Sequence, residues 1–179
     1  MVDIPRAGAW PLEKLPSLVG WLRNTAVDSG SFPSLASPDT YVVPASGAFA
    51  YQGTGFFTLS NFGLLTYSGP DAVCLIEAFV SVFGTLDVAQ QSDMGFGIAK
   101  NGDLAGLTPT VDDPAINLGA GIGRYSNDLS GEYLELTSLR QVNLTSGDTI
   151  QGAIGTGPAG KFTSDITLGT MGMTLTLFV

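Results

Sequence analysis

The side chains that most often carry chemistry are scarce in this chain. Among 179 residues there is no His, and the only Cys is Cys74. Without His, the chain lacks Ser–His and Cys–His nucleophile pairs and the most frequent zinc ligand. Ser60, Ser81 and Thr145 therefore have no His to activate them. A single Cys also excludes an internal disulfide and a cysteine metal cluster, and its apolar surroundings predict a core position.

Carboxylates are the remaining candidates for acid–base or metal chemistry. Asp112 and Asp113 are adjacent, and the other candidates are Asp103, Glu132 and Glu135. A glycosidase holds two carboxylates across a cleft, whereas neighbouring residues of an extended chain point to opposite faces. No Asp-x-Asn-x-Asp spacing indicates a calcium loop. We therefore predict no catalytic residue and no metal ligand.

Three further patterns could mark a binding or modification site. Gly155–Gly160 has the glycine spacing of a dinucleotide loop, but Pro158 and the polar residues after it open no helix to meet a phosphate. Gly119–Gly123 reads as a loop or a close backbone crossing. Asn143-Leu-Thr145 fits a glycosylation sequon. We predict no bound cofactor.

The composition indicates the class of fold that must position any functional site. The chain has 24 Gly, 10 Pro and only 13% charged residues, which favours a turn-rich, folded domain. Its net charge of −9 disfavours a nucleic-acid partner, because phosphate contacts need a basic surface. The longest apolar stretch, Ala72–Gly84, is short of the roughly 20 residues that span a bilayer. We predict no membrane partner and a protein made as a soluble chain.

The same apolar stretch is the clearest strand of the sequence. Its even positions are all apolar and are expected to face the core: Ala72, Cys74, Ile76, Ala78, Val80 and Val82. Its odd positions include four more apolar residues: Val73, Leu75, Phe79 and Phe83. A strand with two apolar faces in an antiparallel fold indicates a subunit interface. The alternative is burial of that second face under the N-terminal segment.

Most of the remaining chain also alternates like strands. Residues 94–100 alternate and lead into Asn101-Gly102, the signature of a type I′ hairpin turn. Residues 131–144 form another candidate, with a bulge expected around Thr137–Ser138 because the apolar phase slips there. Further strands are expected at 40–44, 47–51, 55–60, 62–67, 149–154 and 173–179. About ten short strands predict an all-β fold, an antiparallel β-sandwich.

The first 46 residues differ in composition, with six of the ten prolines and both tryptophans. Apolar residues at helical spacing predict one short amphipathic helix within residues 11–24. We therefore divide the chain into an N-terminal arm, 1–46, and a β-domain, 47–179. The arm is either a strap packed on its own domain or a docking segment for a partner. Its apolar candidates for docking are Trp10, Leu15, Leu18, Trp21 and Leu22.

Five motifs follow one another in an order that resembles the tumour-necrosis-factor-like jelly roll, which is shared with the complement globular head. They are Gly55-Phe-Phe-Thr, Val73–Phe83, Ile98-Ala-Lys-Asn-Gly102, Leu144-Thr-Ser-Gly-Asp-Thr-Ile150 and Met173–Val179. The version without His and with an arm resembles those of bacteriophage virions. The resemblance implies a jelly roll of about ten strands, and a homotrimer whose threefold axis is lined by the second face of residues 72–83.

These expectations define the predicted function. We predict a virion structural protein that is made in a host cytoplasm. It would be a capsid decoration or cement protein on the capsid surface, whose arm contacts the major capsid protein or another virion protein. One alternative is the receptor-binding head of a phage tail fibre or spike. Another is a lectin or glycan-active enzyme, for which Tyr125 is the only aromatic candidate.

Overall fold

The computed structural model describes residues 19–35, 41–84, 91–103, 121–126, 133–156, 162 and 165–179, which form two antiparallel sheets. The first sheet has the order β10 (Leu134–Leu144), β7 (Ala72–Phe83), β12 (Ile166–Phe178), β1 (Val19–Asn24) and β4 (Phe49–Gln52), with β2 (Gly30–Phe32) also paired to β12. The second has the order β5 (Phe57–Leu59), β6 (Leu65–Tyr67), β11 (Thr149–Thr156), β8 (Gln91–Lys100) and β9 (Gly121–Ser126), with β3 (Tyr41–Val42) on β11. A 3-10 turn, η2 (Asn61–Gly63), joins β5 to β6.

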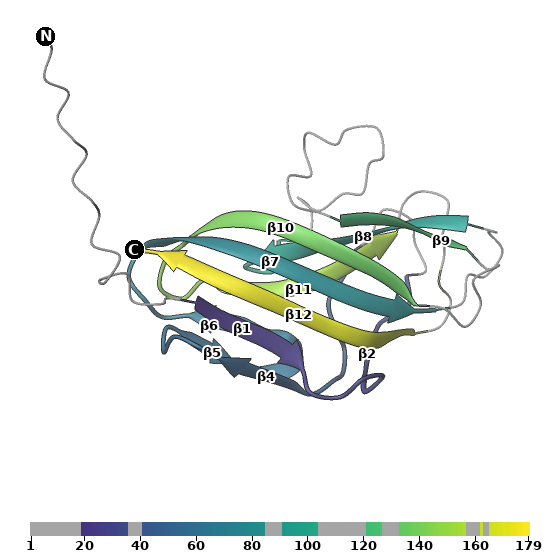
Figure 1. Cartoon of the computed structure of the whole chain (residues 1–179), viewed down its shortest axis with the longest axis horizontal. Coiled ribbons are helices and arrows are strands. Elements are labelled where there is room, and N and C mark those ends of the chain that lie inside the picture. The colour runs from purple at the N-terminus through teal and green to yellow at the C-terminus, as the bar shows by residue number, and fades with distance from the viewer. Residues whose placement is uncertain are drawn as a thin grey trace, which may run out of the picture.

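Strand pairing gives the sandwich jelly-roll topology. Four antiparallel pairs are nested along the chain: β1 with β12, β6 with β11, β7 with β10, and β8 with β9. The pairs alternate between the two sheets, as expected when a long hairpin is rolled into a sandwich. Figure 1 shows β10, β7, β12 and β1 side by side in one layer, with β8 and β11 behind them. The predicted all-β sandwich is confirmed.

The core lies between the sheets and is built from strand alternation. All six even positions of β7 are at most 8% exposed, as predicted, and Cys74 among them is fully buried. Met94, Phe96 and Ile98 of β8 face them from the second sheet and are also fully buried. One side of each sheet is thus committed to the core, so any site must use the outer faces, the edges or the loops.

A polar cluster fixes the turn between β10 and β11 against the hairpin after β8. Asn101 and Gly102 have φ values of 53° and 71°, which confirms the predicted type I′ turn. The Asp148 carboxylate accepts hydrogen bonds from Asn101 Nδ2 (2.7 Å) and from the backbone N–H of Thr145 (2.8 Å), and it pairs with Lys100 Nζ at 2.8 Å. The Lys100 ammonium, and then the hydrogen bonds from Asn101 and Thr145, hold the pKa of Asp148 well below its usual range.

The structure corrects the expected helix in residues 11–24 over its described part. Residues 19–24 form β1, which pairs with β12 on one side and β4 on the other. Val19 and Leu22 have helical spacing, but pairing on both edges satisfies the backbone and places Leu22 inward and Trp21 outward. β2 and β3 likewise belong to the sheets. The described residues before position 47 are therefore part of the sandwich and not an arm outside it.

Two smaller predictions are also wrong. Register between β10 and β7 is unbroken from Leu134↔Val82 to Leu144↔Ala72, so β10 has no bulge at Thr137–Ser138. The apolar phase slips because Leu139 faces outward and is 55% exposed. Residues 119–123 were expected to form a loop or a close backbone crossing. The loop is wrong for Gly121 and Gly123, because both lie on β9 and pair with β8.

Candidate functional site

The outer face of the first sheet carries the strongest candidate for a functional surface. Register aligns its outward side chains in rows that cross β1, β12, β7 and β10. The central row is Trp21, Thr174, Glu77 and Leu139. The flanking rows are Val19, Thr176, Leu75 and Gln141 on one side, and Arg23, Gly172, Phe79 and Thr137 on the other. We refer to these rows, with Val73, Phe178 and Glu135 at their two ends, as the outer face.

Large apolar side chains of the outer face are open to solvent. Trp21 is 47% exposed, Phe79 49% and Phe178 56%. Val73, Leu75 and Phe83, the other predicted interface residues, are half-buried within the chain. Isolated exposed apolar residues are ordinary in proteins, but a group of them on one sheet face makes this face a candidate contact surface.

Two of the predicted interface residues are held in place by neighbours on the same face. The Phe79 ring lies over Gly172, where an added Cβ would be 2.5 Å from Phe79 Cε1. Phe83 packs against Tyr133 at a centroid distance of 5.9 Å, and the Tyr133 hydroxyl donates a hydrogen bond to the Asp28 carboxylate. These contacts pack both rings against neighbouring residues of the same face.

The outer face carries little charge, and its charges are separated. Arg23 lies on β1, Glu77 on β7 and Glu135 on β10. None of the three forms a salt bridge with a residue of the described ranges. The positive charge thus lies on β1, and the two negative charges lie on β7 and β10, on the other side of β12.

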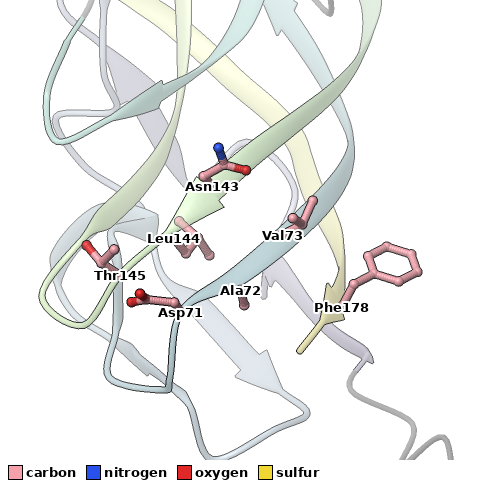
Figure 2. A pocket seen from close by; sticks show the side chains of 7 residues that line it. All are labelled: Asp71, Ala72, Val73, Asn143, Leu144, Thr145 and Phe178. Carbon is pink, nitrogen blue, oxygen red and sulfur yellow. The ribbon is translucent and has the colours of Figure 1, made fainter.

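One end of the outer face is hollowed. A shallow depression of about 350 Å³ lies where β7 begins and β10 and β12 end, lined by Asp71, Ala72, Val73, Asn143, Leu144, Thr145 and Phe178. Figure 2 shows the Phe178 ring standing away from the sheet, and Asp71 and Thr145 on the opposite side of the hollow. It contains one carboxylate and no second titratable group. No cluster of three or more metal-ligating side chains occurs in the described parts of the chain.

The predicted docking residues divide into three groups. Leu22 is 2% exposed and packs in the core, so it is not available for docking. Trp21 is exposed, but it belongs to the outer face. Trp10, Leu15 and Leu18 lie outside the described residues. Sequence reasoning missed Trp21 and Leu139 as members of this face, although their alternation with buried neighbours is a strand signal.

The other chemical candidates gain no support as a site. Burial raises the pKa of the Cys74 thiol to about 12, as expected for a core residue. Asp103 and Glu135 are exposed and lie on different elements. Asp112, Asp113, Glu132 and the segment 157–160 lie outside the described residues, and Tyr125 lies on β9. Within the described ranges, no helix has the length and apolarity to cross a bilayer.

The chain has some likeness to solved structures at low sequence identity. No family model and no curated protein matches the chain. Among solved structures, murine APRIL at pH 5.0 is 16% identical, with a TM-score of 0.49, over 88% of this chain and 98% of that one. Eiger TNF from S. frugiperda is 11% identical, with a TM-score of 0.45, over 92% and 94%. A likeness of this extent identifies no function.

Proposed function

We propose that this chain is a non-catalytic structural protein that associates with copies of itself through the outer face, as a homotrimer. The observation that carries the proposal is the exposure of Trp21 on β1, Phe79 on β7 and Leu139 on β10, on one face of the same sheet. Exposing this apolar area to water is unfavourable, and association of copies through the face removes the area from water.

The size of the outer face supports association. β1, β12, β7 and β10 have 6, 13, 12 and 11 residues, and each residue covers about 3.3 Å along its strand and about 4.8 Å across the sheet. The face therefore measures about 670 Å², of the same order as the roughly 800 Å² that each partner contributes to a standard interface. The number of copies, three, is taken from the resemblance of the sequence to trimeric jelly rolls.

We further propose that the trimer is a capsid decoration protein, with residues 1–18 bound to the shell of a virion. The support is the order of the sequence motifs and the apolar residues Trp10, Leu15 and Leu18 ahead of β1. A protein that binds the assembled shell stabilises it by mass action. The gain is about 2.7 kcal/mol per site at a hundredfold excess over the dissociation constant.

Self-association is tested by light scattering on the full chain. We expect a trimer, and we expect Phe79→Asp to shift it to monomer, because an interface that buries an unpaired carboxylate loses several kcal/mol. Phe62→Asp is the matched control, since Phe62 is 40% exposed on η2 and lies off the outer face. A wild-type monomer at micromolar concentration contradicts the proposal.

The virion role needs particles that carry this chain. Particles stripped of it should release DNA at a lower temperature, and adding back the full chain should restore the midpoint. A chain of residues 19–179, which keeps every described strand, should assemble but fail to bind the particles. If stripped particles melt normally but lose attachment to cells, the receptor-binding head replaces the decoration protein.

A further inference from the structure

We propose that the hollow where β7 begins and β10 and β12 end binds a neutral sugar, as a single hexopyranose ring at the end of a glycan. In this arrangement the Phe178 ring covers the apolar face of the sugar, and the Asp71 carboxylate and the Asn143 side-chain amide bind its hydroxyl groups. The inference goes beyond the proposed structural role and does not depend on it.

The hollow has an apolar floor between an aromatic wall and a polar wall. Ala72 and Leu144 are buried and form the floor. Figure 2 shows the Phe178 ring on one side of this floor and Asp71 and Thr145 on the other. Binding sites for small molecules have this composition, with mostly apolar walls and a few polar groups that orient the ligand.

The register sets the spacing of the two walls. Phe178 pairs with Val73 and Val73 pairs with Asn143, so the three residues form one row across β12, β7 and β10. Neighbouring strands are about 4.8 Å apart, which places the Cα atoms of Phe178 and Asn143 about 10 Å apart. The volume of about 350 Å³ is near the lower end of the roughly 300–1,000 Å³ of small-molecule sites. Both measures suit one six-membered ring.

The polar groups of the hollow are available to a ligand. Asp71 and Asn143 are exposed, and neither side chain has a hydrogen bond or ion pair within the described residues. The Thr145 hydroxyl donates to Asp148 Oδ2 at 3.1 Å and keeps its acceptor lone pairs. A carboxylate accepts several hydrogen bonds, and an amide both donates and accepts. Adjacent hydroxyls of a sugar ring match this set, and their bonds to a carboxylate are charge-assisted.

The aromatic wall supplies the apolar half of the site. The Phe178 side chain is 56% exposed and stands away from the sheet, as Figure 2 shows. The face of an aromatic ring is electron-rich and attracts weakly positive C–H groups. A pyranose has such a C–H face together with a rim of hydroxyls. A ligand with both features uses the aromatic wall and the polar wall at the same time.

Charge distinguishes a neutral sugar from other small ligands. Asp71 is the only titratable side chain among the described residues that line the hollow. The nearby cation, Lys100, is paired with Asp148 and also donates to the backbone carbonyl of Asn143. An acidic sugar or a phosphate would therefore face a negative charge without a free cation. A calcium ion takes about six to eight oxygen ligands, more than one carboxylate and its neighbours supply.

Saturation-transfer NMR on the full chain tests the site with defined probes. These are methyl α-D-mannopyranoside, methyl α-D-glucopyranoside and methyl β-D-galactopyranoside, with N-acetylneuraminic acid as the acidic probe. We expect at least one neutral sugar to bind at millimolar concentration, with the strongest transfer to the C–H groups of one ring face. Binding of the acidic probe alone, or of none of the four, would overturn the inference.

Variants of the two walls locate the binding. Asp71→Asn and Phe178→Ala should each weaken the binding of that sugar by about tenfold or more, as expected for the loss of a hydrogen bond to a charged group or of a large apolar contact. The matched controls are Asp165→Asn, at an exposed position just before β12, and Phe62→Ala, on η2. Both controls should bind like the wild type. Unchanged binding by Asp71→Asn or by Phe178→Ala would refute the site.

Light scattering on the same samples separates this inference from the proposed self-association. Phe178 lies both in the hollow and at the end of the outer face, whereas Asp71 belongs to the hollow alone. Asp71→Asn should therefore lose the sugar while it associates like the wild type. If Asp71→Asn instead dissociates the copies, the hollow serves their contact and the inference fails. A wild-type monomer that binds the sugar would refute the proposed function and leave the sugar site standing.

Discussion

Asp148 offers the sharpest test of how the fold is held together, through the variant Asp148→Asn. Its side chain is 11% exposed and accepts hydrogen bonds from Lys100, Asn101 and Thr145. The side chain of the Asp148→Asn variant keeps one acceptor oxygen. Its NH₂ group replaces the other oxygen and faces donors of the wild-type protein, which leaves both the NH₂ group and those donors without an acceptor. One lost bond to a charged group costs about 1.5–3 kcal/mol, and one unsatisfied buried donor costs about 1–3 kcal/mol. We expect a loss of about 3 kcal/mol in the free energy of unfolding.

Thermal unfolding at neutral pH measures this loss. For a domain of about 150–250 residues, each kcal/mol corresponds to about 2–4 °C, so the melting temperature should fall by about 6–12 °C. Asp165→Asn is the matched control, because Asp165 is exposed just before β12. We expect it to change the melting temperature by no more than a degree or two, since exposed substitutions are usually within about 0.5 kcal/mol.

The pH dependence checks the cause. Because the folded pKa of Asp148 is lowered, its contribution is complete above the ordinary Asp pKa of about 3.9 and is lost as pH falls toward the folded pKa. The difference between wild type and Asp148→Asn should therefore be constant from neutral pH to about pH 5 and shrink below about pH 4. A difference that stays the same down to pH 3, or one below about 0.5 kcal/mol at neutral pH, would refute the reasoning.

Three further predictions follow from the described strands. Cys74 should resist a thiol reagent in the native protein and react fully in denaturant, because it is fully buried and its pKa is raised to about 12; rapid native labelling would show that the core opens. A chain of residues 47–179 should be unfolded by circular dichroism, whereas 19–179 should fold, since β1 pairs with both β12 and β4. Gly172→Ala should displace the Phe79 ring and weaken association more than it lowers the melting temperature, as light scattering and thermal unfolding on the same samples would show.

Strand alternation predicted most of the fold. β7 and β8 could be predicted because their apolar residues alternate over many positions. The Asn101-Gly102 turn could be predicted from the backbone preferences of these two residues alone. β1 was missed because Val19 and Leu22 also satisfy helical spacing. Its partners, β12 and β4, are remote in sequence, and tertiary pairing of this kind overrides local propensity.

The members of the outer face explain why a surface is harder to predict than a core. A core residue of a strand is recognised because every second residue around it is also apolar. Leu139 breaks this alternation in β10, and the break suggested a bulge. Leu139 and the odd positions of β7 depart from the usual strand pattern in the same way, because both place apolar side chains on the outer side of the sheet. Phe79 and Leu139 lie on paired strands, one row apart, so two irregularities that look independent in sequence belong to one surface. Because these residues share one face, the candidate interface extends from β7 to β10, β12 and β1.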